Sequence, residues 1–259
     1  MGWLRVVLRA SAMIFVILFG LVLLLLVRLI ERPIWGLKRP LTPYITQAVC
    51  KLSLLIMGLR LTVRGKWMKQ NGAIISNHSS WIDIFTLNAA KRIYFVAKSE
   101  VANWPLIGWL SRATGTVFIA RRSLDAKIHL GIFAERLKAG HKLMFFPEGT
   151  SNDGLRVLSF KSTLFEAYFV PDLRDSLFIQ PVTVKYSAPA GQDARFYGWW
   201  GDMALAPHLL KTLAQAKQGS VLLIYHAPVA VADFDNRKEL AKYCEQVVRD
   251  GMFGGAIES

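Results

Sequence analysis

Residues 77–83 read Asn-His-Ser-Ser-Trp-Ile-Asp and follow a short apolar run that is typical of a strand. Ser79 or Ser80 could cap a helix that begins here. With His78 outside that helix, the chain can fold back and bring Asp83 against one ring nitrogen. The other nitrogen could then take a proton from a hydroxyl group. The competing interpretation is a helix cap with an accidental histidine nearby.

A glutamate lies at the mouth of a second apolar strand. Residues 143–154 read Leu-Met-Phe-Phe-Pro-Glu-Gly-Thr-Ser-Asn-Asp-Gly. Pro147 and Gly149 are ordinary loop residues after a buried strand. Glu148 is less ordinary, because ligands in α/β proteins tend to bind at strand ends. We therefore expect Glu148 to lie near any site that His78 helps to form.

Two further apolar runs carry residues of interest. Residues 115–120 form a predicted strand that leads into Arg121 and Arg122. Arginine presents a planar fork that suits phosphate or carboxylate. Residues 179–184 form another predicted strand, and its Pro181 indicates a bulge or an edge position.

The order, spacing and residues of these four blocks resemble the glycerolipid acyltransferase family, whose best-known members are the lysophosphatidic acid acyltransferases. The resemblance covers roughly residues 60–190. The pairing of His-x-x-x-x-Asp with Phe-Pro-Glu-Gly in this order is highly specific. The resemblance implies that His78 is the general base and Asp83 its orienting partner. It also implies that Arg121, with Arg122 beside it, contacts the acceptor.

The same resemblance implies further substrate-binding positions. The third block is assigned to acceptor binding and contributes Glu148, Gly149 and Thr150. The fourth is tied to the acyl donor or to the shape of the site and contributes Pro181. Relatives often carry lysines at the positions of Lys98 and Lys161.

Two departures from the family pattern bear on the acceptor. The third block usually continues Gly-Thr-Arg-Ser, whereas residues 149–152 read Gly-Thr-Ser-Asn. The second block commonly has aspartate before its arginine, whereas this chain has Ala120 there and adds Arg122. Relatives that acylate lyso-ornithine lipid look similar here, with Phe-Lys-Ser at 160–162. We expect conversion of lysophosphatidic acid to phosphatidic acid, with acylation of lyso-ornithine lipid or another lysolipid as the alternative.

The sequence offers no convincing protein nucleophile. It lacks a Gly-x-Ser-x-Gly elbow. Cys50 and Cys244 are expected to be packed rather than reactive, and no histidine has a partner at metal-ligand spacing. We therefore expect direct acyl transfer without a metal or cofactor, from coenzyme A or acyl-carrier-protein thioester. A lipid hydrolase is disfavoured by the missing nucleophile, and a non-catalytic lipid-binding protein is the third possibility.

An N-terminal stretch is apolar enough to anchor the chain in a membrane. Hydrophobic residues make up 53% of the sequence, and no charged residue occurs from 10 to 27. As a helix this stretch would span about 27 Å, close to the hydrocarbon thickness. A secretory signal peptide is the alternative, but no small-residue cleavage site follows. We expect a membrane anchor over 1–60, with a transmembrane helix at about 10–30 and a second apolar or interfacial helix at about 44–60.

The net charge is +14, from 32 Lys and Arg against 18 Asp and Glu. The basic residues are scattered and no nucleic-acid module is recognisable, so we expect no nucleic-acid partner. Attraction to membrane phospholipids, and to an acidic carrier protein or coenzyme A, explains the charge more simply. Basic residues are more numerous after the apolar stretch than before it, which favours a cytoplasmic active site.

Strand-like and helix-like runs alternate from residue 61 onward, which predicts an α/β fold with a mainly parallel central sheet flanked by helices. The strands are expected at 61–64, 73–76, 93–97, 116–120, 142–146, 178–184 and 221–226. Helical spacing between 124 and 137 ends at Gly140, and a closing helix is expected at 238–250. One domain over 61–253 would then be followed by a flexible tail at 254–259.

Overall fold

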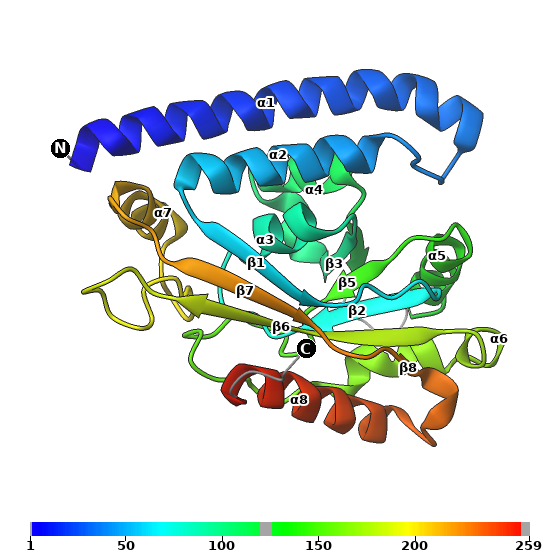
Figure 1. The fold of residues 1–259 in the computed structure, drawn as a ribbon. Helices are drawn as coiled ribbons and strands as arrows, with labels where there is room; N and C mark the ends of the chain where they lie inside the picture. The colour runs from blue at the N-terminus through cyan, green and yellow to red at the C-terminus, as the bar shows by residue number, and fades with distance from the viewer. Residues whose placement is uncertain (1, 120–125, 255–259) are drawn as a thin grey trace.

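A mainly parallel sheet lies between helices on both faces (Figure 1). The computed structural model describes residues 2–119 and 126–254. Neighbouring strands follow the order β1-β7-β6-β2-β5-β3-β4, and β8 pairs with β6. Among the strands described, only the β6–β7 and β6–β8 pairings are antiparallel. The predicted fold class is therefore confirmed.

The strands are β1 (Arg60–Gly65), β2 (Gly72–Ser76), β3 (Tyr94–Lys98), β4 (Val117–Ile119), β5 (Leu143–Phe145), β6 (Phe178–Ser187), β7 (Ser220–Tyr225) and β8 (Val229–Ala230). The helices are α1 (Gly2–Trp35), α2 (Thr42–Met57), α3 (Asp83–Ala90), α4 (Ile107–Thr114), α5 (Ala126–Lys138), α6 (Pro171–Arg174), α7 (Leu205–Ala214) and α8 (Arg237–Phe253). All seven expected strands are present, and the two-residue β8 was not predicted. The expected tail lies outside the described residues except for Gly254.

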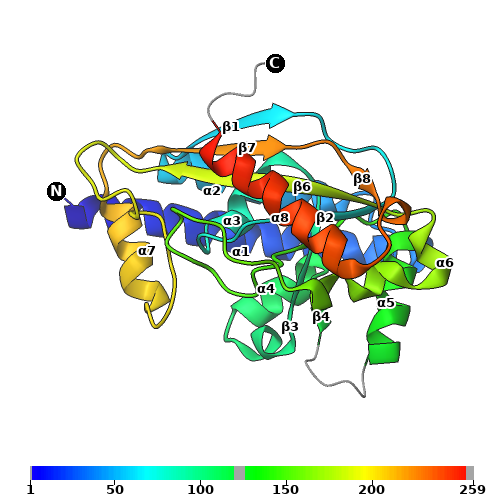
Figure 2. The same cartoon turned by 90° about the horizontal axis from the view of Figure 1, so that it is seen from below.

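Alternation along β2 builds one apolar core on each side of the sheet. Ile74 packs into the cluster that includes residues of α1, α2 and α3. Ala73 and Ile75 face the other way, into the cluster that includes residues of α8. Successive strand residues point to opposite faces, so a central strand with apolar residues throughout fits burial on both sides. Seen from below, α8 crosses the sheet on the face away from α1 (Figure 2).

Pro181 lies in an interior strand, so the expected edge position is wrong, whereas the bulge is present. β6 pairs with β2 on one side and with β7 and β8 on the other. Between the pairs Val182–Tyr225 and Ile179–Val229, two residues of β6 face three of the opposing segment. The Pro181 carbonyl accepts from the His226 amide on that side. Its missing N–H would point the same way, so the ladder to β2 loses no hydrogen bond.

The two N-terminal helices lie side by side along one face of the domain (Figure 1). α1 extends beyond the predicted 10–30 at both ends. α2 ends before the predicted residue 60, because Gly58 takes a left-handed conformation with φ of 80° and β1 starts at Arg60. Gly20 permits the close approach of the helices, since a Cβ there would lie 2.2 Å from Val49.

Both ends of α1 are tied to the rest of the molecule. Near its start, Arg5 and Arg9 donate to backbone carbonyls at the end of α7. Near its other end, the buried Glu31 accepts from the Leu41 and Thr42 amides and from the Thr42 hydroxyl. Among the described helices, α1 alone is long and apolar enough to cross a membrane. This property supports membrane association.

Candidate active site

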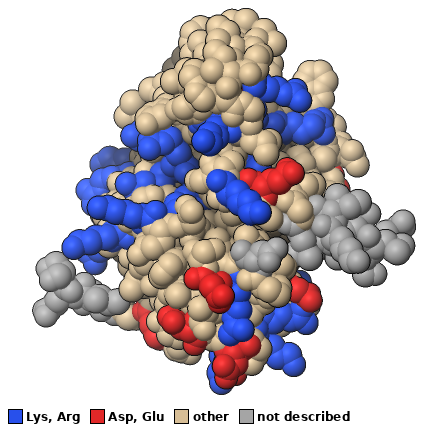
Figure 3. Space-filling model, turned by 90° about the vertical axis from the view of Figure 1, so that its right-hand side faces the viewer, with Lys and Arg blue, Asp and Glu red and all other residues tan. Residues whose placement is uncertain are grey.

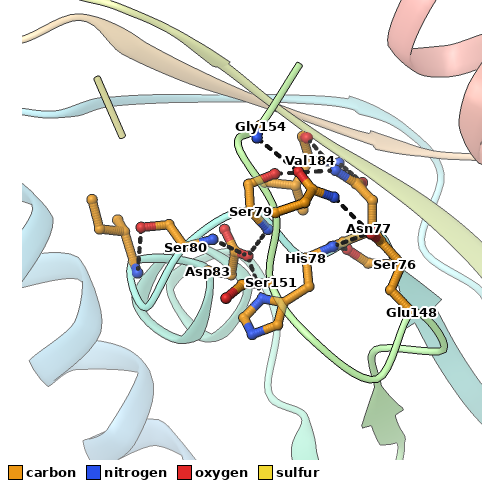
Figure 4. Close-up of polar contacts among 12 residues, drawn as sticks. Ser76, Asn77, His78, Ser79, Ser80, Asp83, Glu148, Ser151, Gly154 and Val184 are labelled. Carbon is orange, nitrogen blue, oxygen red and sulfur yellow. Dashed lines mark hydrogen bonds and ion pairs between the residues drawn. The ribbon is translucent and has the colours of Figure 1, made fainter. Parts of the chain in front are cut away.

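His78 lies in the loop between β2 and α3, at the carboxyl end of the sheet's central strand. Its ring nitrogen Nδ1 is 2.7 Å from the Asp83 oxygen Oδ2 (Figure 4). The ring stacks on Phe146, with centroids 3.9 Å apart. Its side chain is 19% exposed, and Nε2 has no hydrogen bond within the described residues. The predicted contact between the His78 and Asp83 side chains is confirmed.

The carboxylate of Asp83 is fully buried and held by neutral donors. Oδ2 also accepts from the backbone amides of Ser79, at 2.8 Å, and Ser80, at 3.0 Å. Oδ1 accepts from the Tyr186 hydroxyl at 2.7 Å. The expected serine cap is wrong, because α3 begins at Asp83 and the Ser80 hydroxyl accepts only from the Ile82 amide ahead of it.

This arrangement fixes which ring nitrogen of His78 carries the proton. A carboxylate only accepts hydrogen bonds, so Nδ1 must be the donor and Nε2 is left with a lone pair. Burial, and then the nearby Asp83 charge, raise the pKa of Tyr186 well above its usual value, so its hydroxyl stays protonated and donates. The result is an oriented, partly exposed imidazole whose Nε2 has a lone pair that can accept a proton.

Glu148 supports the His78 loop from the other side. Oε1 accepts from the His78 amide at 2.8 Å, and Oε2 accepts from the Asn152 side chain at 2.6 Å and the Leu158 amide at 3.1 Å. The residue is only 2% exposed. Burial raises the pKa of Glu148 to about 7, against the lowering effect of these hydrogen bonds. Both oxygens are therefore engaged with the protein itself.

Asn77 joins the same loop to β6. Its side-chain oxygen accepts from the Val184 amide and its nitrogen donates to the Val184 carbonyl, each at 2.8 Å. Neither Asn77, Asn152 nor Tyr186 was singled out as a site residue from the sequence. Asn77 could have been, because it is adjacent to His78. Tyr186 carries no local signal, since it follows Asp83 by 103 positions.

Two lysines border the turn at Gly149. Lys98 donates to the Gly149 carbonyl at 2.8 Å. Gly149 has φ of 73°, and a Cβ there would lie 2.8 Å from the Lys161 nitrogen. Thr150 follows on the surface and donates weakly to the Ser151 carbonyl, at 3.5 Å. The structure thus brings Lys98, Gly149 and Lys161 together next to Glu148.

Of the remaining predicted site residues, the structure describes only Pro181. Pro181 is buried within β6, paired with Ile75 of β2. Arg121 and Arg122 lie outside the described residues. Within the part of the chain that the structure describes, no cluster of three or more His, Cys, Asp or Glu could hold a metal ion.

Known proteins resemble this chain in sequence and in fold. The family described as Acyltransferase matches residues 60–185. A lyso-ornithine lipid O-acyltransferase from Rhodobacter capsulatus is 55% identical over 96% of this chain and 90% of its own. A second lyso-ornithine lipid O-acyltransferase, from Pseudomonas aeruginosa, is 33% identical over 99% of this chain and 96% of its own. The crystal structure of the 1-acyl-sn-glycerophosphate (LPA) acyltransferase PlsC from Thermotoga maritima has the same fold, with a TM-score of 0.66. The match covers 97% of this chain and 96% of that one, at 22% sequence identity. Since relatives of this identity cover nearly the whole chain, the protein is an enzyme of the acyltransferase family.

Proposed function

We propose that this enzyme transfers a fatty acyl group from a thioester to the free hydroxyl of a lyso-ornithine lipid at a membrane surface. The observation that carries the chemistry is the 2.7 Å contact between His78 Nδ1 and Asp83, which leaves Nε2 as a base.

The reaction proceeds as a direct transfer. His78 Nε2 removes the proton of the acceptor hydroxyl as that oxygen attacks the thioester carbonyl carbon. The carbon–sulfur bond then breaks, and the departing thiolate takes the proton back from the imidazolium. No protein nucleophile is needed, because a thiolate leaves readily. Holding both substrates in line could supply up to about 7–11 kcal/mol of the barrier. The donor is acyl-carrier-protein or coenzyme A thioester.

The other site residues bind or support. Lys98 and Lys161, at the Gly149 turn, offer positive charge to an anionic group of donor or acceptor. We assign the same role to Arg121 and Arg122. Thr150 borders the turn on its exposed side. Glu148 holds the His78 backbone rather than the acceptor, since both its oxygens are engaged. Pro181 shapes the sheet beneath the site.

The sequence alone ranks lysophosphatidic acid first, and two observations favour reversing that order. The relatives that are 55% and 33% identical over nearly the whole chain are both named for lyso-ornithine lipid, whereas the structure named for LPA is 22% identical. This chain also has Ser151 where the glycerolipid acyltransferases commonly carry arginine. An ornithine headgroup presents a carboxylate and an ammonium in place of a phosphate. The missing arginine of the third block weighs against an acceptor that bears a phosphate.

The N-terminal helix gives this chemistry a location. α1 presents a row of exposed apolar side chains along its length. Holding the site at the bilayer surface avoids moving the acyl chains into water, which would cost about 0.8 kcal/mol per CH₂ group. The excess of basic residues after the apolar stretch at 10–27 favours a cytoplasmic site.

An acceptor panel tests the substrate assignment. Washed membranes that contain the full-length enzyme receive labelled acyl thioester with lyso-ornithine lipid, lysophosphatidic acid or glycerol 3-phosphate. We expect diacyl product chiefly from lyso-ornithine lipid. A product chiefly from lysophosphatidic acid would restore the original order, with the same chemistry at His78.

A further inference from the structure

A basic pocket lies at the amino ends of β3 and β5, on the side of the sheet opposite to the strand end that carries His78. Its volume is about 660 Å³, and it opens beneath the turn between α1 and α2. Arg92 and Lys142 line it just before β3 and β5, whereas His78 follows the carboxyl end of the parallel β2. Six cationic side chains and no Asp or Glu line the pocket: Lys38, Arg39, Lys51, Lys91, Arg92 and Lys142.

The positive charge of this basic pocket is only weakly offset by carboxylates, since Glu31 attracts Arg39 from a distance without forming an ion pair with it. Among the described residues, none of the six cations forms an ion pair. Arg92 lies over the Tyr44 ring at 4.1 Å, and Lys91 lies over Trp67 at 5.9 Å. Arg39 donates to a backbone carbonyl at 2.8 Å. These three cations are thus held in place by rings and a carbonyl while their charge stays available to an anion.

A buried histidine in the wall lacks a partner. His141 lines the pocket, is 5% exposed and stacks on Tyr94. Neither of its ring nitrogens has a hydrogen-bond partner of good geometry within the described residues. Burial, and then the charges of Arg136 and Arg39, lower its pKa to about 3, against a smaller opposite effect of the Leu37 backbone. The neutral ring therefore keeps an N–H for which the protein offers only the Leu37 carbonyl, in poor geometry, and a bound anion would accept it.

We propose that the basic pocket binds the phosphate headgroup of an anionic phospholipid. The pocket sits where the apolar surface of α1 ends, and the exposed Trp35 there is typical of a bilayer interface. A lipid whose headgroup occupies the pocket can lay its acyl chains along α1. On the face shown in Figure 3, Lys and Arg gather in the upper half, beneath the end of α1, and acidic side chains lie mainly below.

The bound headgroup would hold the enzyme at the membrane from a point away from the reacting groups. α3 links the two places, since Asp83 begins it and Ala90, at its other end, lines the pocket. The binding site therefore serves attachment, and its variants leave the contacts of His78 intact.

The test measures lipid binding to the full-length protein in detergent by native mass spectrometry. The probes are dioctanoyl phosphatidylglycerol, dioctanoyl phosphatidylcholine and inorganic phosphate. The pocket variant is Lys51→Gln with Arg92→Gln. The matched control is Lys238→Gln with Lys242→Gln, which removes the same charge from exposed positions on α8. Acyl-transfer rate in detergent, expected to be unchanged in both, reports correct folding.

We expect one phosphatidylglycerol per chain, bound about tenfold more weakly by the pocket variant and within twofold of wild type by the control. Phosphatidylcholine should bind at least tenfold more weakly than phosphatidylglycerol. Equal losses in both double variants would mean general surface attraction and would overturn the proposal. So would displacement of the lipid by an equal concentration of inorganic phosphate, since the pocket would then select a soluble anion.

Discussion

At the scale of single residues, the site depends on carboxylates whose partners lie inside the protein. Asp83 accepts from two backbone amides and the Tyr186 hydroxyl in addition to His78. These neutral donors fix its position without adding a charge that would compete for the imidazole. Tyr186 is therefore a positioning residue.

The raised pKa of Glu148 predicts a pH-dependent stability. Its folded pKa of about 7 exceeds the ordinary value of 4.5, so the folded state binds this proton more tightly than the unfolded state. Wild-type stability should therefore fall as pH rises from 4.5 to 7 and level off above 7. In Glu148→Gln this contribution, at most about 3 kcal/mol, is absent. Thermal unfolding in detergent at pH 5, 6, 7 and 8 measures the difference.

Glu135→Gln, at an exposed position on α5, controls for removing one carboxylate. Equal pH slopes for wild type and Glu148→Gln would contradict a raised pKa at this position.

Local spacing predicted the pairing of His78 with Asp83, because His78 lies in a loop and Asp83 begins the helix that directly follows it. It could not predict Tyr186, which reaches Asp83 only because β6 pairs with β2. The role of Glu148 was also only partly predictable. Its place at a strand mouth was visible, but the inward hydrogen bonds of its oxygens depend on the path of the loop to Leu158.

At the scale of helices and strands, the apolar runs predicted which elements exist better than they predicted where each element ends. Each expected strand is present, since a run of four to seven residues that contains several apolar side chains is enough to mark one. The end of α2 was missed because the apolar pattern continues past Gly58, where the backbone turns left-handed. Pro181 predicted a bulge or an edge position, and only the bulge is present, because a proline is tolerated inside a sheet where two partner strands meet across a bulge.

The attachment of α1 to α2 predicts a loss of stability in Glu31→Ala. The buried Glu31 accepts hydrogen bonds from the Leu41 and Thr42 amides at the start of α2. The first amides of a helix have no acceptor within the helix itself. Removing the carboxylate leaves these donors unpaired, and we expect a loss of roughly 1–3 kcal/mol. Thermal unfolding in detergent measures it. Arg32→Ala, at the exposed neighbouring position, should change stability by less than about 0.5 kcal/mol. A similar, small effect of both substitutions would show that Glu31 does not support α2.

At the scale of the whole molecule, the net charge of +14 and the one long apolar helix among the described residues point to a protein that associates with a membrane surface. The sequence predicted both properties, because they depend on composition. The basic pocket could not be predicted, since its lysines and arginines come from α2, from the turn before it and from the segments that lead into β3 and β5.

The proposed cytoplasmic orientation of the domain predicts a labelling pattern. Cys50 and Cys244 are buried, so Lys242→Cys places one accessible thiol on α8. In bacterial spheroplasts that express this variant, a membrane-impermeant maleimide should label the protein only after lysis. Labelling of intact spheroplasts would place the domain on the outer side. Wild-type protein, labelled in parallel, measures the background of the two buried cysteines.

The central claim is that the Asp83-held imidazole of His78 activates the acceptor hydroxyl. The most direct test is the rate of acyl transfer by His78→Ala, measured on full-length enzyme with labelled thioester and lyso-ornithine lipid. Loss of the general base should lower the rate on the order of 10²- to 10⁴-fold, while membrane association and the unfolding temperature stay close to wild type. A folded, membrane-associated His78→Ala enzyme that turns over within twofold of wild type would contradict the claim.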